Sequence, residues 1–178
     1  MSVPSATVDV VQAAIAGDEI AFERLLQPLL DPAYRLACAM LHDHHAAEDA
    51  VQDSAFKAWR KISQLRDGAR MRPWFLSIVA NECRSQRRSR AREARRDSPA
   101  PALATSPDAA ALAGIELRSA VAAMDESKRL LLVLHWYLDL PVAEIAAITN
   151  LSVHAAESRI VRATNELKSR LEAGRGRP

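Results

Sequence analysis

The sequence contains only two cysteines, Cys38 and Cys83, and no C-x-x-C motif. This scarcity argues against a disulfide framework, so we expect both to be small buried apolar residues of a protein in a reducing compartment. No apolar run reaches the roughly 18 residues that a membrane span requires, and the first residues lack the charged-then-apolar pattern of a secretory signal. We therefore expect a cytoplasmic protein without membrane insertion.

Glycine and aromatic residues are also scarce, with five glycines and 4% aromatic residues in a chain of 178. Alanine, leucine and arginine dominate instead, which favours helices packed through aliphatic side chains. The net charge of +2 is unevenly distributed. Residues 1–65 carry five basic and nine acidic groups, residues 66–96 ten and three, and residues 97–178 nine and ten. This layout predicts different surfaces for different partners.

The basic stretch from Arg66 to Arg96 predicts a helix that is apolar at its start and basic at its end. Its first half carries apolar residues at helical spacing, Trp74, Phe75, Ile78 and Val79. Its second half places polar residues along one side, Asn81, Arg84, Arg88 and Arg92. Such a helix suits a phosphate backbone, because each phosphate that an arginine neutralises releases condensed counterions. The alternative is a solvated arginine face.

The polar connector from Lys61 to Arg72 lies beside this basic helix. A loop next to arginines and an aromatic residue is typical of sites that hold single-stranded nucleic acid, where bases stack on aromatic or guanidinium planes. Trp74 could serve in this way, although taken alone it fits a core position better.

A second informative helix is predicted from His45 to Arg60. We expect its buried side to comprise Ala47, Val51, Ala55, Phe56 and Trp59. Its exposed side carries an acidic and amide-bearing surface formed by Glu48, Asp49, Gln52 and Asp53. The helix dipole is a sufficient structural reason for Glu48 and Asp49, but Asp53 gains less from it. Without a cleft or a nucleophile, this surface is better interpreted as a docking face for a basic partner than as an acid–base site.

Two other features of the first half affect the expected fold. Asp31-Pro32 is typical of an N-cap followed by a first-turn proline, so we expect a new helix to begin there. Three histidines occur within His42–His45 and raise the question of a metal site. His44 and His45 are adjacent and no H-E-x-x-H spacing is present, so we expect a solvated helix start and neither a metal nor a cofactor.

The segment from Asp97 to Asp108 is rich in proline and lacks a periodic apolar face, which predicts a linker. The sequence therefore predicts an all-α protein with two small helical domains joined by a flexible linker. The expected bounds are 8–96 for the first domain, 97–109 for the linker and 110–173 for the second domain.

The second domain ends in two segments with helix-turn-helix spacing. Pro141 begins a short helix, Asn150 lies where the turn requires a positive φ, and Ser152 caps a long helix. The long helix would present Ser152, His154, Glu157, Ser158, Arg159 and Arg162. Its first residues would enter a major groove, where Arg159 and Arg162 suit guanine or phosphate and Glu157 could accept from cytosine or repel phosphate. Inert bundle packing is the alternative for this pair taken alone.

These segments together resemble a known family. AFERLLQPLLDPAYRLACAML, AAEDAVQDSAFKAWRKI and MRPWFLSIVANECRSQRR resemble region 2 of bacterial RNA polymerase sigma factors of the extracytoplasmic-function (ECF) group. LLLVLHWYLDLPVAEIAAITNLSVHAAESRIVRATNELKSRL resembles their region 4. The likeness covers nearly all of the chain outside its ends and the linker, in the same order.

The resemblance implies a role for each surface. The acidic face of Glu48, Asp49, Gln52 and Asp53 would dock on the clamp coiled coil of the polymerase β′ subunit. The melted −10 element would contact Arg72, Trp74, Asn81, Arg84, Arg87 and Arg88. The −35 element would contact Ser152, His154, Glu157, Ser158, Arg159 and Arg162. The implied partners are core RNA polymerase through its β and β′ subunits, promoter DNA and an anti-sigma factor, and no catalytic chemistry is implied.

Two positions depart from the family pattern. His154-Ala155-Ala156-Glu157 replaces a Gly-Thr-Val-Lys run that is common there, which exchanges a phosphate-binding lysine for a carboxylate. Pro141 stands where a serine or threonine cap is common. Two other hypotheses remain open, a free-standing helix-turn-helix repressor or activator and a helical metallo-enzyme. The first leaves the acidic and arginine-rich helices without roles, and the second lacks a convergent ligand set.

Overall fold

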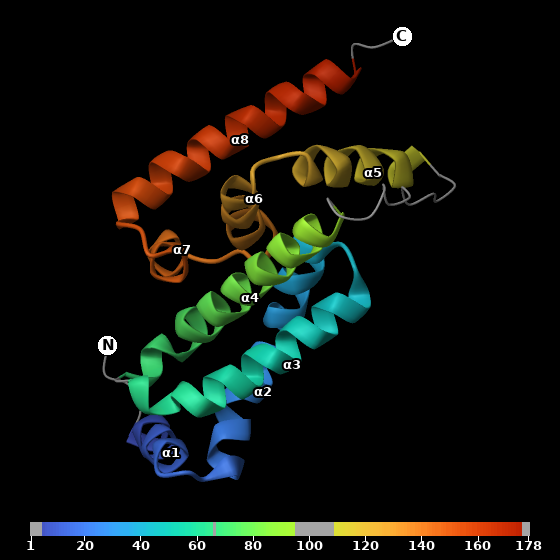
Figure 1. The fold of residues 1–178 in the computed structure, drawn as a ribbon. Helices are drawn as coiled ribbons and strands as arrows, with labels where there is room; N and C mark the ends of the chain where they lie inside the picture. The colour runs from blue at the N-terminus through green and yellow to red at the C-terminus, as the bar shows by residue number, and fades with distance from the viewer. Residues whose placement is uncertain (1–4, 66, 95–108, 176–178) are drawn as a thin grey trace.

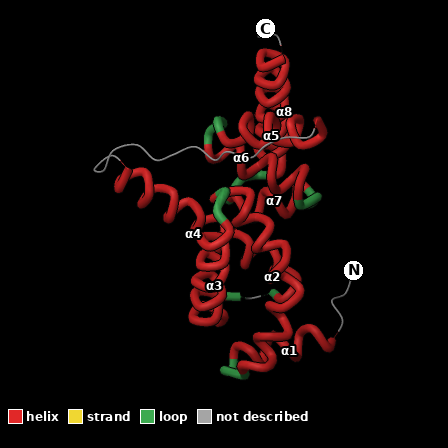
Figure 2. Tube along the Cα trace, turned by 90° about the vertical axis from the view of Figure 1, so that its right-hand side faces the viewer, coloured by secondary structure: helices red, strands yellow, loops and turns green. Residues whose placement is uncertain are grey.

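The computed structural model describes residues 5–65, 67–94 and 109–175, and within these ranges every regular element is helical (Figures 1 and 2). This confirms the predicted all-α class. The predicted linker lies almost entirely outside the described residues.

The N-terminal group contains α1 (Ser5–Ile15), α2 (Glu19–Leu41), α3 (His44–Lys61) and α4 (Met71–Ala94). Short 3-10 turns at Ile62–Gln64 and Gly68–Arg70 connect α3 to α4. Aspartate side chains cap two of these helices. Asp18 accepts from the Ala21 N–H at 3.0 Å and Asp43 from the Ala46 N–H at 3.1 Å. These caps fix where α2 and α3 begin.

The predicted new helix at Asp31-Pro32 is wrong, because α2 runs through both Pro28 and Pro32 without a break. An interior proline costs about 3 kcal/mol in an isolated helix. Here the buried side of α2, with Leu29, Ala33 and Leu36, continues through the prolines. Burial of that side compensates for the lost backbone hydrogen bonds.

The C-terminal group contains α5 (Ala109–Ala122), α6 (Glu126–Leu132), a π turn η3 (Val133–Tyr137), α7 (Val142–Thr149) and α8 (Val153–Arg175). Arg129 of α6 is only 1% exposed and donates to the carbonyl oxygens of Val121 and Met124, both at 3.1 Å. A buried guanidinium requires such partners. Arg129 thereby ties the end of α5 to α6.

The two groups pack against each other (Figure 1), with α7 in contact with α4 and η3 in contact with α2. Phe75 and Leu76 of α4 and Ile145 and Ile148 of α7 belong to one continuous cluster of buried side chains. Arg35 of α2 donates to the Tyr137 carbonyl at 2.8 Å, and its guanidinium carbon lies 4.6 Å from the centre of the Tyr137 ring. The helices that the sequence assigns to two domains therefore share a core in this arrangement.

Candidate nucleic-acid interface

The predicted basic helix is α4, and its buried and polar sides separate as the sequence pattern indicates. Phe75, Leu76 and Val79 are fully buried. Asn81 and Arg88 are exposed, and Arg84 is half-buried with its Nη1 3.4 Å from the Asn81 Oδ1. The structure thus brings Asn81, Arg84 and Arg88 together on one accessible side of α4, where guanidinium groups can meet phosphates.

Other arginines of α4 hold the helix in place. Arg87 donates from its Nη1 to the Met40 carbonyl at 3.1 Å, and Arg90 pairs with Asp43 at 3.2 Å. Both contacts reach the turn between α2 and α3. Arg87 therefore already has a partner within the protein, in addition to its predicted contact with the −10 element. No sequence pattern indicated this partner.

Two predicted contacts with the −10 element lie at the start of α4. Arg72 is exposed, but its guanidinium pairs with both carboxylate oxygens of Glu144 in α7, with 2.7 Å between the Arg72 Nε and the Glu144 Oε2. Trp74 is half-buried and packs against the core, so its face is only partly accessible for base stacking. Whether either residue contacts DNA stays a prediction.

The predicted acidic face lies on α3, where Glu48, Asp49, Gln52 and Asp53 are all exposed. The predicted buried side is wrong at one position, because Phe56 is 62% exposed. A step of 100° per residue places Phe56 between Asp49, Gln52 and Asp53 on the exposed side of the helix. Its position in the helical repeat could have indicated this, but its apolar character suggested burial.

The helix pair α7–α8 has the turn chemistry that the sequence predicts. Asn150 ends α7 with φ of 55°, and the Ser152 Oγ accepts from the Ala155 N–H at 3.2 Å. Pro141 precedes α7 and supplies no side-chain acceptor. These observations confirm the three local predictions for the turn.

The buried side of α8 includes Ala156, Ile160 and Ala163, and none of the predicted DNA-reading residues is among them. Ser158 is half-buried, whereas the other predicted contacts are exposed, namely Ser152, His154, Glu157, Arg159 and Arg162. Arg162 donates from its Nε to the Ser158 carbonyl at 3.1 Å, which orients its side chain along the helix. The arrangement offers polar side chains from the first turns of a helix, which is the geometry of major-groove reading.

The cysteines and histidines differ partly from expectation. Burial raises the pKa of the Cys83 thiol to about 12, as expected for an inert core cysteine. Cys38 is only half-buried and its Sγ lies 3.7 Å from the His44 Nδ1, so the prediction that both cysteines are buried is wrong. The same His44 nitrogen is 3.1 Å from the Tyr34 hydroxyl. Within the described residues, no three histidine, cysteine or acidic side chains come close enough to hold a metal ion.

Comparison with known protein families accounts for both groups of helices. The sequence model of sigma-70 region 2 matches residues 25–93, and that of sigma-70 region 4 matches residues 114–167. The chain belongs to the sigma-70 family of bacterial RNA polymerase sigma factors. The first match spans most of α2 and all of α3, and extends to Glu93 in α4, whereas the second ends within α8.

Individual relatives place this sigma factor in the ECF group. It is 32% identical over 75 residues, 42% of this chain and 38% of the relative, to the ECF RNA polymerase sigma factor SigM of Mycobacterium tuberculosis. It is 25% identical to the sigma factor NccH of Alcaligenes xylosoxydans, over 97% of this chain and 98% of NccH. It is 28% identical over 89% of its length to RfaY of Xanthomonas campestris, a probable sigma factor. The match spans 42% of the length of that relative.

Solved structures agree with the fold of this sigma factor. RpoE of Bartonella quintana, solved in complex with the anti-sigma factor NepR, has 27% sequence identity and a TM-score of 0.69. The likeness covers 85% of this chain and 96% of that one. None of the described helices is both long and apolar enough to cross a membrane.

Proposed function

We propose that this sigma factor binds core RNA polymerase in the cytoplasm and directs promoter-specific transcription initiation. The observation that carries the proposal is the presence of both sigma-70 regions in order on one chain. Each region has an exposed polar surface of its own, so the chain can hold a promoter at two points. We assign no catalytic chemistry to it, since a sigma factor acts by binding.

The acidic face of α3 is the surface we propose for core polymerase. Glu48, Asp49, Gln52 and Asp53 are exposed together, and the resemblance to sigma factors assigns this face to the coiled coil of β′. Carboxylates on such a face steer association and select a basic partner. The alternative of a free-standing helix-turn-helix regulator would leave this face without a role.

The test is the affinity of the purified sigma factor for core polymerase. Asp49→Asn combined with Asp53→Asn should weaken binding with little effect on thermal stability, because both side chains are exposed. A control that combines Asp31→Asn with Glu172→Gln removes the same charge from exposed positions on α2 and α8. Equal affinity of the two double variants would contradict the docking assignment.

For promoter DNA, we propose that the exposed side of α4 contacts the melted −10 element and that the first turns of α8 contact the −35 element. Asn81, Arg84 and Arg88 form the accessible part of the first surface, and Arg159 and Arg162 provide the positive charge of the second. Arg72 is paired with Glu144 in this arrangement, so its use on DNA requires this ion pair to separate. Core polymerase would provide the energy for that separation through its own contacts.

We also propose that an anti-sigma factor regulates this chain. RpoE of Bartonella quintana, which shares its fold, was solved in complex with an anti-sigma factor. Co-expression with candidate inhibitors and measurement of core polymerase binding would test this partner.

A further inference from the structure

Phe56 is the most unusual residue on the surface of α3. Its side chain is 62% exposed, although a phenylalanine normally contributes to a core. It lies one helical turn after Gln52 and Asp53, and the guanidinium carbon of Arg60 lies 5.8 Å from the centre of its ring. Most of an aromatic ring is thus left accessible on an otherwise polar face.

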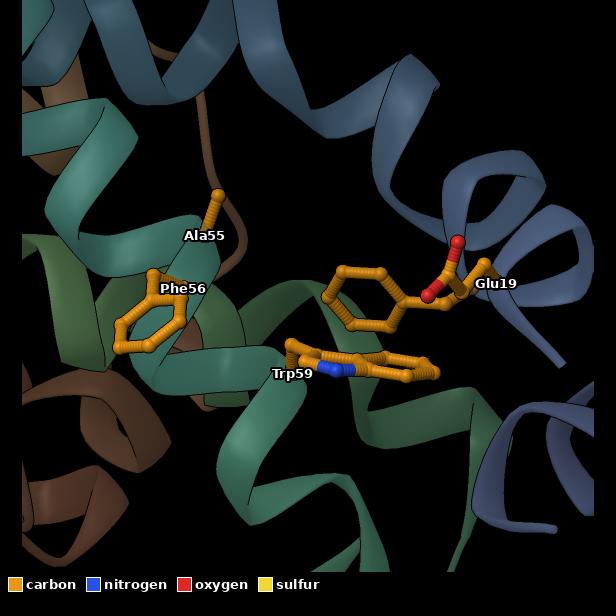
Figure 3. A pocket seen from close by; sticks show the side chains of 5 residues that line it. Glu19, Ala55, Phe56 and Trp59 are labelled. Atoms are coloured by element: carbon orange, nitrogen blue, oxygen red, sulfur yellow. The ribbon is translucent and has the colours of Figure 1, made fainter. Parts of the chain in front are cut away.

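Phe56 borders a shallow depression of about 360 Å³ between α3 and the start of α2, lined by Glu19, Phe22, Ala55, Phe56 and Trp59 (Figure 3). Two of the lining side chains, Phe22 and Trp59, pack on each other with their rings edge to face and the ring centres 5.0 Å apart. The depression beside Phe56 is thus lined mostly by apolar side chains, two of which are packed aromatic rings.

The charges around this apolar surface indicate the kind of partner. Asp49 and Asp53 lie on one side of Phe56 along α3, and Glu19 lies across the depression. Lys57, a basic residue next to Phe56, is paired with Glu82 of α4. The apolar ring therefore has a mostly acidic border, although Arg60 also lies near it. Protein interfaces are typically built from an aromatic centre with a polar rim, and aromatic residues carry much of their binding energy.

We propose that Phe56 is the apolar anchor of the polymerase-docking face and packs against an aliphatic side chain on a basic helix of core polymerase. The inference rests on the proposed function, because it takes the acidic face of α3 as the docking surface. The continuity of Phe56 with that face and the acidic border favour this occupant. A second copy of the chain fits less well, since a symmetric pairing would bring the carboxylates of two acidic faces together.

The test compares the dissociation constants of variants for core polymerase. Phe56→Ala should raise Kd by roughly 10- to 100-fold, whereas Phe56→Leu should keep most of the affinity because it retains apolar volume. Val161→Ala is the matched control, because Val161 is 58% exposed on α8 and lies outside the docking face. Thermal unfolding of each variant, followed by circular dichroism, verifies that the helices are intact.

The outcomes separate this inference from the proposed function. If Phe56→Ala binds core polymerase like wild type while the Asp49→Asn, Asp53→Asn variant binds weakly, the anchor is overturned and the docking face stands. If neither variant loses affinity, the docking face itself is refuted. If sedimentation shows a wild-type dimer that Phe56→Ala dissociates, with core binding unchanged, the surface serves self-association and the inference is overturned.

Discussion

Glu144→Gln should loosen the contact between α4 and α7. Glu144 accepts from the Nε and Nη2 of Arg72, so that one carboxylate engages two guanidinium donors. The substitution keeps the shape and one acceptor oxygen but removes the charge. Glu144 and Arg72 belong to different sigma regions. The substitution should therefore destabilise the closed arrangement, in which the two groups of helices pack together, and not the fold of either group alone.

The exposure of the pair sets the expected size of the effect. The side chain of Arg72 is 44% exposed and that of Glu144 25% exposed, so water screens part of their attraction. Partly exposed ion pairs contribute about 0.3–1 kcal/mol, which corresponds to a factor of about 1.7 to 5 in an equilibrium constant. The buried cluster shared by α4 and α7 and the contact of Arg35 with Tyr137 remain in the variant. We therefore expect a shift in population and not complete opening.

The assay is the fluorescence anisotropy of a labelled single-stranded oligonucleotide at low salt. If Arg72 must leave Glu144 to contact DNA, apparent affinity scales with the open fraction, and Glu144→Gln should bind up to about fivefold more tightly than wild type. Glu172→Gln, at an exposed position on α8, controls for the change in net charge. The reasoning is refuted if Glu144→Gln binds like wild type while Arg72→Ala binds more weakly. A gain well above tenfold would also refute it, since so large an effect exceeds what the exposure of the pair allows.

Three further predictions concern single residues. The Ala46 N–H, and then Arg90, hold the pKa of Asp43 below its ordinary value. The stabilisation is therefore present at neutral pH and is lost as pH falls through the lowered pKa of the folded state. In urea unfolding, Asp43→Asn should therefore lose less stability than wild type as pH falls below the ordinary aspartate pKa of 3.8. Arg159→Ala should relax base choice at one −35 position by roughly 1–3 kcal/mol in binding to mutated promoter sites with holoenzyme, and an equal loss on every site would instead indicate a phosphate contact. A thiol reagent should label the half-buried Cys38 and spare Cys83, because burial raises the pKa of the Cys83 thiol to about 12. Mass spectrometry would detect the labelled residue, and equal labelling of both cysteines would contradict the burial of Cys83.

Local chemistry explains the parts of the fold that the sequence predicted correctly. Asn150 and Ser152 act within a few residues of their own positions, so the turn and the cap can be predicted from neighbouring residues. The polar face of α3 also follows from helical spacing alone. In these cases the interacting groups lie within a few residues of each other in the sequence.

The incorrect predictions involve contacts over longer distances. Pro32 ends a helix by its local preference, but the packing of Ala33 and Leu36 in the core keeps α2 continuous. Phe56 lies among polar residues in the helical repeat, so its spacing indicated exposure, whereas its apolar character suggested burial. The pairing of Arg72 with Glu144 joins residues 72 positions apart and has no local pattern. The sequence was therefore sufficient to locate the polar surfaces, but it was not sufficient to predict which distant residues pack or pair with them.

If this sigma factor gives core RNA polymerase its choice of promoter, adding it must change where transcription begins. The most direct measurement is in vitro transcription with bacterial core enzyme on a genomic fragment library, with and without the purified protein. We expect the protein to join core enzyme and transcripts to begin at a limited set of new sites that share −10 and −35 sequences. Transcription unchanged by the protein, together with tight binding of duplex DNA by the protein alone, would contradict it.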